Sequence, residues 1–253
     1  MNKIVLHIPH SSIYIPEEYR KDFWMDEESL NKNLVALTDW KTEELFDVPE
    51  ARNIVFPVSR LVCDPERYRE DEKEEMAKKG MGLAYTHDAF GKQYRNVDSF
   101  LRERILTDFY DPHHAALYEA CKGTIEKEKM CLLIDCHSFS GTPLPYENAG
   151  ELDRPDFCIG VDSTHTPREL VERITAFLTD KGYRVKIDYP YAGTMIPGEL
   201  YGDKRLKGFM IEINRDLYMQ KNLLQKSERF EEIKKVIGEV IRLATHFHFI
   251  YND

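Results

Sequence analysis

The chain has 253 residues, of which 42% are hydrophobic, so it can form a substantial core and is too apolar to be disordered. Its formal net charge of −10 argues against a nucleic-acid partner, because phosphate binding needs clustered positive charge. Its apolar runs are shorter than those of a signal peptide and shorter than the ~20 residues that span a bilayer. We therefore expect a cytoplasmic protein without a membrane partner, and its oligomeric state is left open.

Five cysteines lie at positions 63, 121, 131, 136 and 158. Their odd number and the lack of a Cys-x-x-Cys pair predict neither a disulfide framework nor a structural zinc knuckle. Reduced thiols are therefore expected, as is usual in the cytoplasm.

Short apolar runs alternate with helical patterns along the chain. This alternation is typical of an α/β fold, in which helices flank a mainly parallel sheet. The pattern shows no linker, so a single domain over residues 1–253 is expected. The predicted strands are Lys3–Ile8, Asn53–Val58, Met130–Asp135, Phe157–Val161, Tyr183–Ile187 and Gly208–Ile213.

Three helices stand out from the apolar spacing. A long helix is predicted from about Val97 to Glu128, and Pro112 is expected to kink or split it. The clearest helix follows Thr166, which is expected to cap it in a capping box with Glu169. The last helix is predicted from about Glu228 to Leu243.

The segment at about residues 65–95 differs from the rest of the chain. It is highly charged, has scattered glycines and contains few apolar positions. It is interpreted either as a solvated surface excursion or as a lid over the site, since ligand-binding loops often lie on such connections.

The first predicted strand ends in the segment HIPHSS, which contains His7 and His10. Pro9 cannot donate a backbone hydrogen bond and is expected to end the strand, which leaves His10 on the loop beyond it. Ligands of open α/β sheets bind at this carboxyl end of the strands. His10 is therefore a candidate metal ligand, while His7 is expected to stay on the strand as a core or surface histidine.

Two further candidates lie in LTDW and LLIDCHSFSG. Asp39 either caps the helix that starts there or supplies an oxygen ligand beside imidazoles. His137 comes just after a buried strand and is either a hydrogen-bonded core histidine or a ligand. Asp135 lies two residues earlier, on the same face if the strand continues, and could fix the tautomer of His137.

Glu212 lies inside the apolar run GFMIEIN, where a carboxylate is costly to bury unless it is paired or catalytic. It either pairs with Arg215 or acts as a general base whose pKa is raised by burial. Arg60 and Arg67 lie in SRLVCDPERY, and arginines bind carboxylates through two hydrogen bonds. The usual fate of such arginines is a surface ion pair.

Together these residues comprise three ligand-type side chains near strand ends, a buried Glu near a fourth strand end and a cationic loop. They are the parts of a mononuclear zinc hydrolase, which needs three protein ligands, an open position for water and a carboxylate that takes a proton.

At these residues the chain resembles the N-formylglutamate amidohydrolase (deformylase) family. That family is similar to the zinc carboxypeptidases, so the resemblance implies a three-layer α/β/α sandwich around a mixed, mainly parallel sheet. The matching segments occur in the family's order and cover most of the chain: HIPHSSIYIP, LTDW, SRLVCDPERY, DPHHAALYEA, LIDCHSFSGTP, PDFCIGVDSTHTP, PYAGT and MIEINRDLYM.

The resemblance implies roles for the candidate residues. CHSFS and IEINR are similar to two carboxypeptidase strands, which assigns His137 to zinc and Glu212 to the general base. It makes His10 and Asp39 the remaining ligands, although carboxypeptidases take a His-x-x-Glu pair from one loop, and on that analogy His7 would pair with His10.

The resemblance further implies that zinc, or another divalent transition metal, serves in the hydrolysis of an acidic N-acyl amino acid, with N-formyl-L-glutamate yielding formate and glutamate. The implied substrate-binding residues are Arg60, Arg67, Arg215, Asn214 and His114. Two departures affect the substrate pocket, because the family's Asn-Arg reads Glu66-Arg67 and its aromatic-His pair reads His113-His114. A hydrolase of another amide and a non-catalytic metabolite-binding protein remain alternatives.

Overall fold

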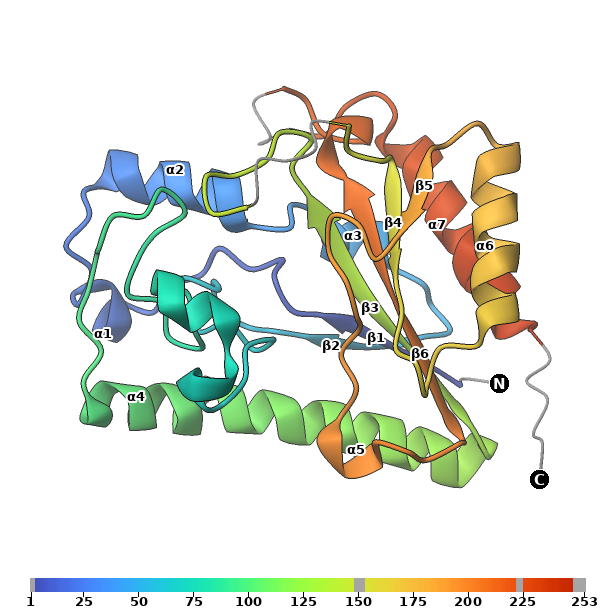
Figure 1. The fold of residues 1–253 in the computed structure, drawn as a ribbon, viewed down its shortest axis with the longest axis horizontal. Helices are drawn as coiled ribbons and strands as arrows, with labels where there is room; N and C mark the ends of the chain where they lie inside the picture. Colours follow the sequence, from blue (N-terminus) through green and yellow to red (C-terminus); the bar gives the residue numbers. More distant parts are fainter. Residues whose placement is uncertain (1–2, 148–152, 222–224, 248–253) are drawn as a thin grey trace.

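The computed structural model describes residues 3–147, 153–221 and 225–247, which are organised around one six-stranded sheet (Figure 1). The strand order is β2-β1-β3-β6-β4-β5, and neighbouring strands are parallel except where β4 meets β6. This mixed, mostly parallel sheet confirms the predicted fold class. The strands are β1 (Ile4–Ile8), β2 (Arg52–Val55), β3 (Cys131–Phe139), β4 (Phe157–Gly160), β5 (Val185–Ile187) and β6 (Leu206–Asn214).

Helices cover both faces of the sheet, which produces the three-layer sandwich that the resemblance implied (Figure 1). On one face Leu117 and Ile125 pack against Val5 and Leu133, and on the other a larger apolar cluster forms. The helices are α5 (Asp111–Glu128) on the first face, and α3 (Thr42–Leu45), α6 (Arg168–Asp180) and α7 (Phe230–Thr245) on the second.

The face under α5 changes from apolar to polar along the central strands. Alternate residues of a strand point to the same side of the sheet, so one face can be followed by counting in twos. Near the amino ends it carries the buried apolar residues Val5, Leu133 and Leu206. Near the carboxyl ends the same alternation presents the polar residues His7, Asp135, His137 and Glu212. A polar site is thereby built at the carboxyl edge of an otherwise apolar layer.

A further group of elements extends from the carboxyl end of β1 (left in Figure 1). Its own apolar cluster includes Tyr19, Leu37, Phe56 and Tyr94. Its helices are α1 (Glu17–Arg20), α2 (Glu27–Leu37) and α4 (Ser99–Ile105).

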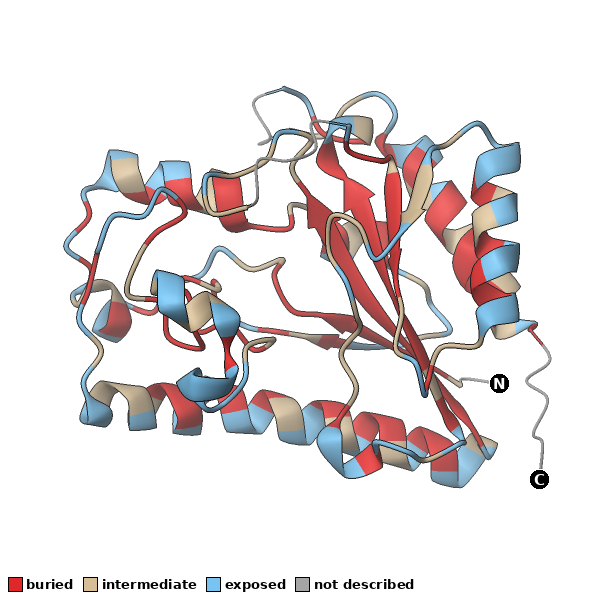
Figure 2. Ribbon diagram, viewed as in Figure 1, coloured by how far each residue is buried: buried red, intermediate tan, exposed pale blue. Residues whose placement is uncertain are grey.

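The charged segment at about residues 65–95 belongs to this group. It is partly exposed, because the 3-10 turns Asp71–Lys73 and Glu75–Lys79 carry solvent-facing charges (Figure 2). Met81, Leu83 and Tyr85 are nevertheless buried in the apolar cluster. The segment is thus anchored as well as charged, and closure of its exposed part over a substrate stays a prediction.

The helix predicted from Val97 to Glu128 is split just before Pro112. α4 ends at Ile105, a π-helical turn spans Leu106–Tyr110, and α5 then begins with the proline in its first turn. The chain keeps right-handed helical backbone angles through the π turn, so the wider hydrogen-bond pattern of that turn comes directly before the proline, which lacks a backbone N–H.

Helix α2 was not predicted from the sequence. Its start is marked by Asp26, whose carboxylate accepts a hydrogen bond from the Ser29 amide at 2.8 Å. Its buried side consists of Leu30, Asn33, Ala36 and Leu37, and the polar Asn33 interrupts the apolar spacing by which a helix is predicted.

The capping box predicted for Thr166 is wrong. Pro167 occupies the cap position of α6, and the Thr166 hydroxyl donates instead to the Gly208 carbonyl oxygen at 2.6 Å. The hydroxyl also accepts a hydrogen bond from the Asp162 amide at 2.8 Å. A tertiary contact with the neighbouring strand thus replaces the local one.

Candidate metal centre and active site

Strand register places polar side chains beside one another at the carboxyl edge of the sheet. His7 of β1 pairs with Asp135 of β3, and His137 of β3 pairs with Glu212 of β6. β3 runs to Phe139, four residues beyond its predicted end, so His137 lies on the strand and not after it. The correction places His137 and Glu212 on the same face of the sheet.

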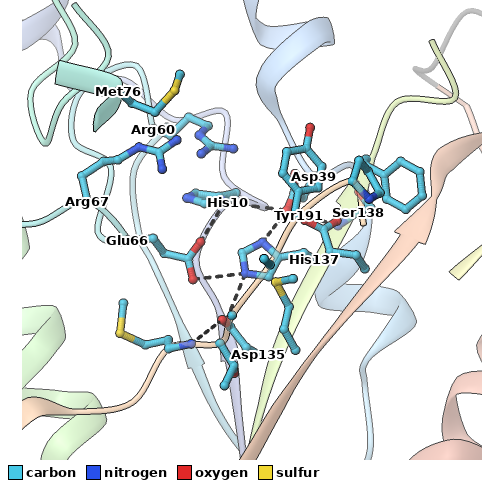
Figure 3. A pocket seen from close by; sticks show the side chains of 18 of the residues that line it. His10, Asp39, Arg60, Glu66, Arg67, Met76, Asp135, His137, Ser138 and Tyr191 are labelled. Atoms are coloured by element: carbon cyan, nitrogen blue, oxygen red, sulfur yellow. Dashed lines mark hydrogen bonds and ion pairs between the residues drawn. The ribbon is translucent and has the colours of Figure 1, made fainter. Parts of the chain in front are cut away.

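His10, Asp39 and His137 come together from three parts of the fold (Figure 3). His10 lies on the loop after β1, and Asp39 lies between α2 and α3. Asp39 Oδ2 is 3.0 Å from His137 Nδ1 and 3.8 Å from His10 Nδ1. All three residues are buried, and one donor atom of each lies within 4.8 Å of the others. Two imidazoles and a carboxylate form a donor set that zinc accepts.

The Asp39 carboxylate does not cap α3, which was the alternative interpretation. The Asp39 carbonyl oxygen accepts the hydrogen bonds from the Thr42 amide and hydroxyl instead, at 3.3 and 2.9 Å. The Asp39 amide donates to the His10 carbonyl oxygen at 2.9 Å, which fastens the two loops together. The carboxylate is left to face the histidines and accepts from the Ser138 amide at 3.2 Å.

His10 directs an unprotonated nitrogen into the centre. Its Nε2 lies 2.9 Å from Asp64 Oδ1, and because a carboxylate only accepts, Nε2 carries the proton and Nδ1 of the neutral ring is bare. His10 is 2% exposed, and Nδ1 has no hydrogen-bond partner among residues 3–147, 153–221 and 225–247. A cation would satisfy this buried lone pair, so the residues present fit a metal.

His137 lies between carboxylates on both sides. Its Nδ1 faces Asp39, while its Nε2 is 3.1 Å from both Asp135 Oδ1 and Glu66 Oε1. Burial alone would lower the pKa of His137, but the charges of Glu66 and Asp135 raise that pKa well above its ordinary value. The raised pKa means that the His137 ring holds a proton on each nitrogen firmly. A metal ion beside Asp39 could replace the proton on Nδ1.

Glu212 lines the same cavity and is 6% exposed. Within the described part of the chain its Oε2 has no hydrogen-bond partner. Burial is the largest cause that raises the pKa of Glu212 to about 8, because desolvation disfavours the charged carboxylate. A carboxyl group with this pKa can accept and return a proton near neutral pH.

Arg60 and Arg67 line the cavity (Figure 3). Both lie beside the carboxylate of Asp64, which they share. Asp64 Oδ2 is 2.7 Å from Arg60 Nη2 and 3.4 Å from Arg67 Nε. Asp64 is also the carboxylate that bonds His10. Two guanidinium groups therefore have one carboxylate between them, which leaves positive charge in the cavity for an anionic ligand.

Arg215 lines the cavity, but its guanidinium is committed to the end of α2. Its nitrogens donate to the carbonyl oxygens of Val35, Ala36 and Thr38 at 3.3, 3.0 and 2.6 Å. Arg215 is 2% exposed. It holds the loop that carries Asp39, which differs from the predicted contact with substrate.

Asn214 and His114 are placed differently from each other. The Asn214 amide donates to the Pro155 carbonyl oxygen at 3.2 Å, and Asn214 is not among the described residues that line the cavity. His114 does line the cavity, with its Nε2 2.8 Å from the Pro65 carbonyl oxygen.

Replacing Arg215 with Ala is expected to loosen the Asp39 loop. Three carbonyl oxygens at the end of α2 would lose a charged donor, and such hydrogen bonds contribute ~1.5–3 kcal/mol each, so the free energy of unfolding should fall by more than about 3 kcal/mol. Metal affinity should fall with it, whereas Arg215→Lys should retain part of both. Urea unfolding and zinc titration of the two variants would check this, and zinc affinity equal to the wild type in Arg215→Ala would contradict it.

Glu66 is a residue of the centre that the predicted ligand set lacks. Its Oε1 lies 3.1 Å from His137 Nε2, and its Oε2 lies 3.8 Å from His10 Nδ1. The available signal was the position of Glu66 in the motif SRLVCDPERY, where the family has Asn.

Tyr191 and Arg154 were also missed. Both line the cavity and both bond Glu147, and no local pattern marks them. The whole cavity has a volume of about 1090 Å³.

One protein family matches most of the chain. The model of the family described as N-formylglutamate amidohydrolase matches residues 2–219. The chain belongs to the N-formylglutamate amidohydrolase family. The resemblance seen in the sequence is thereby confirmed, and membership supports a hydrolase that acts on an amide bond. None of the curated proteins matches the chain.

Two solved structures share the fold. The N-formylglutamate amidohydrolase from Ralstonia eutropha JMP134 is 24% identical, with a TM-score of 0.82 over 96% of this chain and 93% of that one. The gene product Atu2144 from Agrobacterium tumefaciens is 18% identical, with a TM-score of 0.69 over 95% of this chain and 91% of that one. In the described ranges, none of the helices is both long enough and apolar enough to cross a bilayer.

Proposed function

We propose that the protein is a zinc-dependent amidohydrolase that cleaves an N-acyl acidic amino acid, with N-formyl-L-glutamate as the leading substrate and formate and glutamate as its products. The observation that carries the proposal is the buried His10 nitrogen that points, unpartnered among the described residues, toward Asp39 and Glu66 beside His137 and Glu212. Family membership supports the amide-cleaving chemistry. Five free, buried thiols suit a cytoplasmic protein.

His10, Asp39 and His137 would hold the metal. When bound, a zinc ion lowers the pKa of water toward ~7 and polarises a carbonyl group. Another divalent transition metal could be held by the same donors, since imidazole and carboxylate ligands accept several. His7 points its Nδ1 at Asp135, 2.8 Å away, and belongs to a separate group of side chains, so Asp39 is the better third ligand.

Glu212 would move the proton in the reaction. Its raised pKa lets the carboxylate take a proton from the attacking water and return that proton to the departing amine. Its Oε2 has no competing donor among the residues described, so the oxygen is available to the substrate side of the cavity.

Arg60 and Arg67 would bind the substrate carboxylates. An acidic protein repels a dianion at long range, so recognition needs a local positive pocket. The two guanidiniums that share Asp64 provide it. The proposed contacts of Arg215, Asn214 and His114 with substrate have weaker support, because each of these side chains already bonds a backbone carbonyl oxygen.

Replacing Arg67 with Gln is expected to raise KM for acidic substrates about tenfold or more, since a charged hydrogen bond contributes ~1.5–3 kcal/mol. The kcat should change less, because the guanidinium binds a part of the substrate that does not react. Arg154→Gln is a control of the same type, because Arg154 also lines the cavity but is paired with Glu147. Steady-state kinetics would check the prediction, and an unchanged KM in Arg67→Gln would remove Arg67 from the carboxylate site.

The proposed function is tested by metal analysis and a formate-release assay. Purified protein should contain or take up one zinc ion and release formate from N-formyl-L-glutamate. A panel of other N-acyl amino acids and peptides distinguishes a hydrolase of another amide, and the absence of both zinc binding and turnover would favour a metabolite-binding protein. Retention of ligands and base together argues against that last alternative.

A further inference from the structure

A chain of hydrogen bonds leads from helix α5 to the back of the metal centre. His113 Nε2 lies 2.8 Å from His7 Nε2, and His7 Nδ1 lies 2.8 Å from Asp135 Oδ1. Asp135 Oδ1 in turn lies 3.1 Å from His137 Nε2. His7 is fully buried and His113 is 6% exposed, and the mechanism proposed above uses neither.

The direction of each bond follows from what the groups can donate. An ionised carboxylate only accepts, so Asp135 receives the proton of His7 Nδ1 and shares that of His137 Nε2 with Glu66. The other oxygen of Asp135 accepts from the Met195 amide at 2.9 Å. A neutral imidazole carries a single N–H. His7 Nε2 is therefore an acceptor, and His113 Nε2 is the donor that faces it.

The position of His113 keeps that ring neutral. It lies near the start of α5 and faces the sheet side of that helix, where it is 6% exposed and its Nε2 contacts only His7 Nε2 at 2.8 Å among the described hydrogen bonds. Burial is the largest cause that lowers the pKa of His113 to about 2. A neutral His113 with its proton on Nε2 completes an unbroken sequence of donors and acceptors.

We propose that His113 and His7 are positioning residues that hold the Asp135 carboxylate as an acceptor, so that His137 keeps its proton on Nε2 and presents the bare Nδ1 to the metal. The inference rests on the proposed metal centre. Carboxylates behind ligating histidines act in this way by fixing the tautomer and the ring orientation. Here two further imidazoles, those of His7 and His113, stand behind the carboxylate. They connect the metal centre to helix α5, which covers one face of the sheet.

The same atoms could be read as a second cation site, because His7, Glu66 and Asp135 also bring donor atoms within 4.8 Å of one another. The hydrogen bonds favour positioning. Both nitrogens of His7 and the facing oxygen of Asp135 have partners, whereas the bare nitrogen of the centre belongs to His10. The two interpretations differ in the number of ions bound.

The experiment compares His113→Leu with His113→Gln. Leu removes the donor and keeps an apolar side chain, whereas the Gln amide can place an N–H close to where the imidazole Nε2–H lies. Zinc affinity is measured by competition with a chromophoric chelator, and thermal unfolding of the metal-free variants is measured alongside. We expect His113→Leu to bind zinc about 10–100-fold more weakly than the wild type, and His113→Gln to recover most of that loss.

Equal zinc affinity in all three proteins, or equal losses in the Leu and Gln variants, would overturn the proposal. So would two zinc ions per chain in the wild type. Wild-type protein that binds no zinc would refute the metal centre itself, which separates failure of the proposed function from failure of this inference. Nitrogen-15 NMR of the wild type provides a reading that needs no variant to fold: zinc-loaded protein should show His7 protonated on Nδ1 only, and protonation on Nε2 would contradict the proposal.

Discussion

Replacing Glu212 with Gln should lower kcat about 10²–10⁴-fold, the range that a positioned general acid–base group contributes. The amide is close to the carboxyl in shape, so the β6 strand and its register with β3 should persist. It cannot take a proton from water, and so the chemical step loses its base. Zinc content should stay equal to that of the wild type, because Glu212 is not a member of the ligand group.

The measurement is steady-state hydrolysis of N-formyl-L-glutamate together with metal analysis of the same preparations. Glu147→Gln is the matched control, since Glu147 also lines the cavity but its carboxylate is bonded to Arg154 and Tyr191. We expect a much smaller loss of kcat in the control. Parallel loss of zinc and activity in Glu212→Gln would instead give Glu212 a structural role.

The pH dependence of the reaction should change with this variant. A carboxyl group with a pKa of about 8 is mostly protonated below that pH, so its base form and the rate both increase as the pH rises. A bound dication favours the carboxylate and moves this increase to lower pH. The wild type should therefore show an acidic limb in kcat that Glu212→Gln lacks, and identical profiles would show that another group titrates.

Removal of the metal or of a ligand is expected to have the second large effect. Chelation should abolish turnover and added zinc should restore it. His10→Ala should lower kcat/KM by about 10³-fold or more at limiting zinc, since a catalytic metal contributes several kcal/mol and each 1.36 kcal/mol is a factor of ten. The physical reason is that Asp39 and His137 alone offer too few donors to hold a zinc ion.

His165 supplies the matched control for this experiment. It is also a buried histidine, but its nitrogens bond the Leu206 carbonyl oxygen and the Gly202 amide at 2.9 and 3.0 Å. His165→Asn should therefore reduce stability and leave zinc affinity unchanged. Competition with a chelator gives the affinities, and full zinc binding by His10→Ala would exclude His10 from the centre.

Zinc affinity should also rise with pH. The pKa of His137 is raised well above its ordinary value, so a proton competes with the metal for this ring. Each proton released on binding makes the affinity change about tenfold per pH unit, with tighter binding at higher pH. Calorimetry in two buffers of different ionisation enthalpy would count the protons, and zero release would contradict the competition.

Candidate residues whose type conflicts with the apolar pattern around them could be singled out from the sequence, and those in polar stretches could not. His10 and Glu212 were identified because a polar group at the edge of an apolar strand conflicts with the local pattern. Glu66 and Arg154 lie in polar surroundings of the sequence, where nothing local separates a cavity residue from a surface one. Arg215 was assigned to substrate, and only the packing of α2 against it revealed another use of its donors.

The sequence by itself determined the α/β class, the six strands and most of the central donor set, because alternation of apolar residues and the residue types at strand ends are local properties of the chain. The tertiary structure decided which side chains share a partner. Strand register put His7 against Asp135 and His137 against Glu212, and a loop contact turned the Asp39 carboxylate away from its helix. His137 and Asp39, for example, are about 100 positions apart in the sequence. Contacts of this kind are selected by the packing of the whole fold, and no local sequence pattern indicates them.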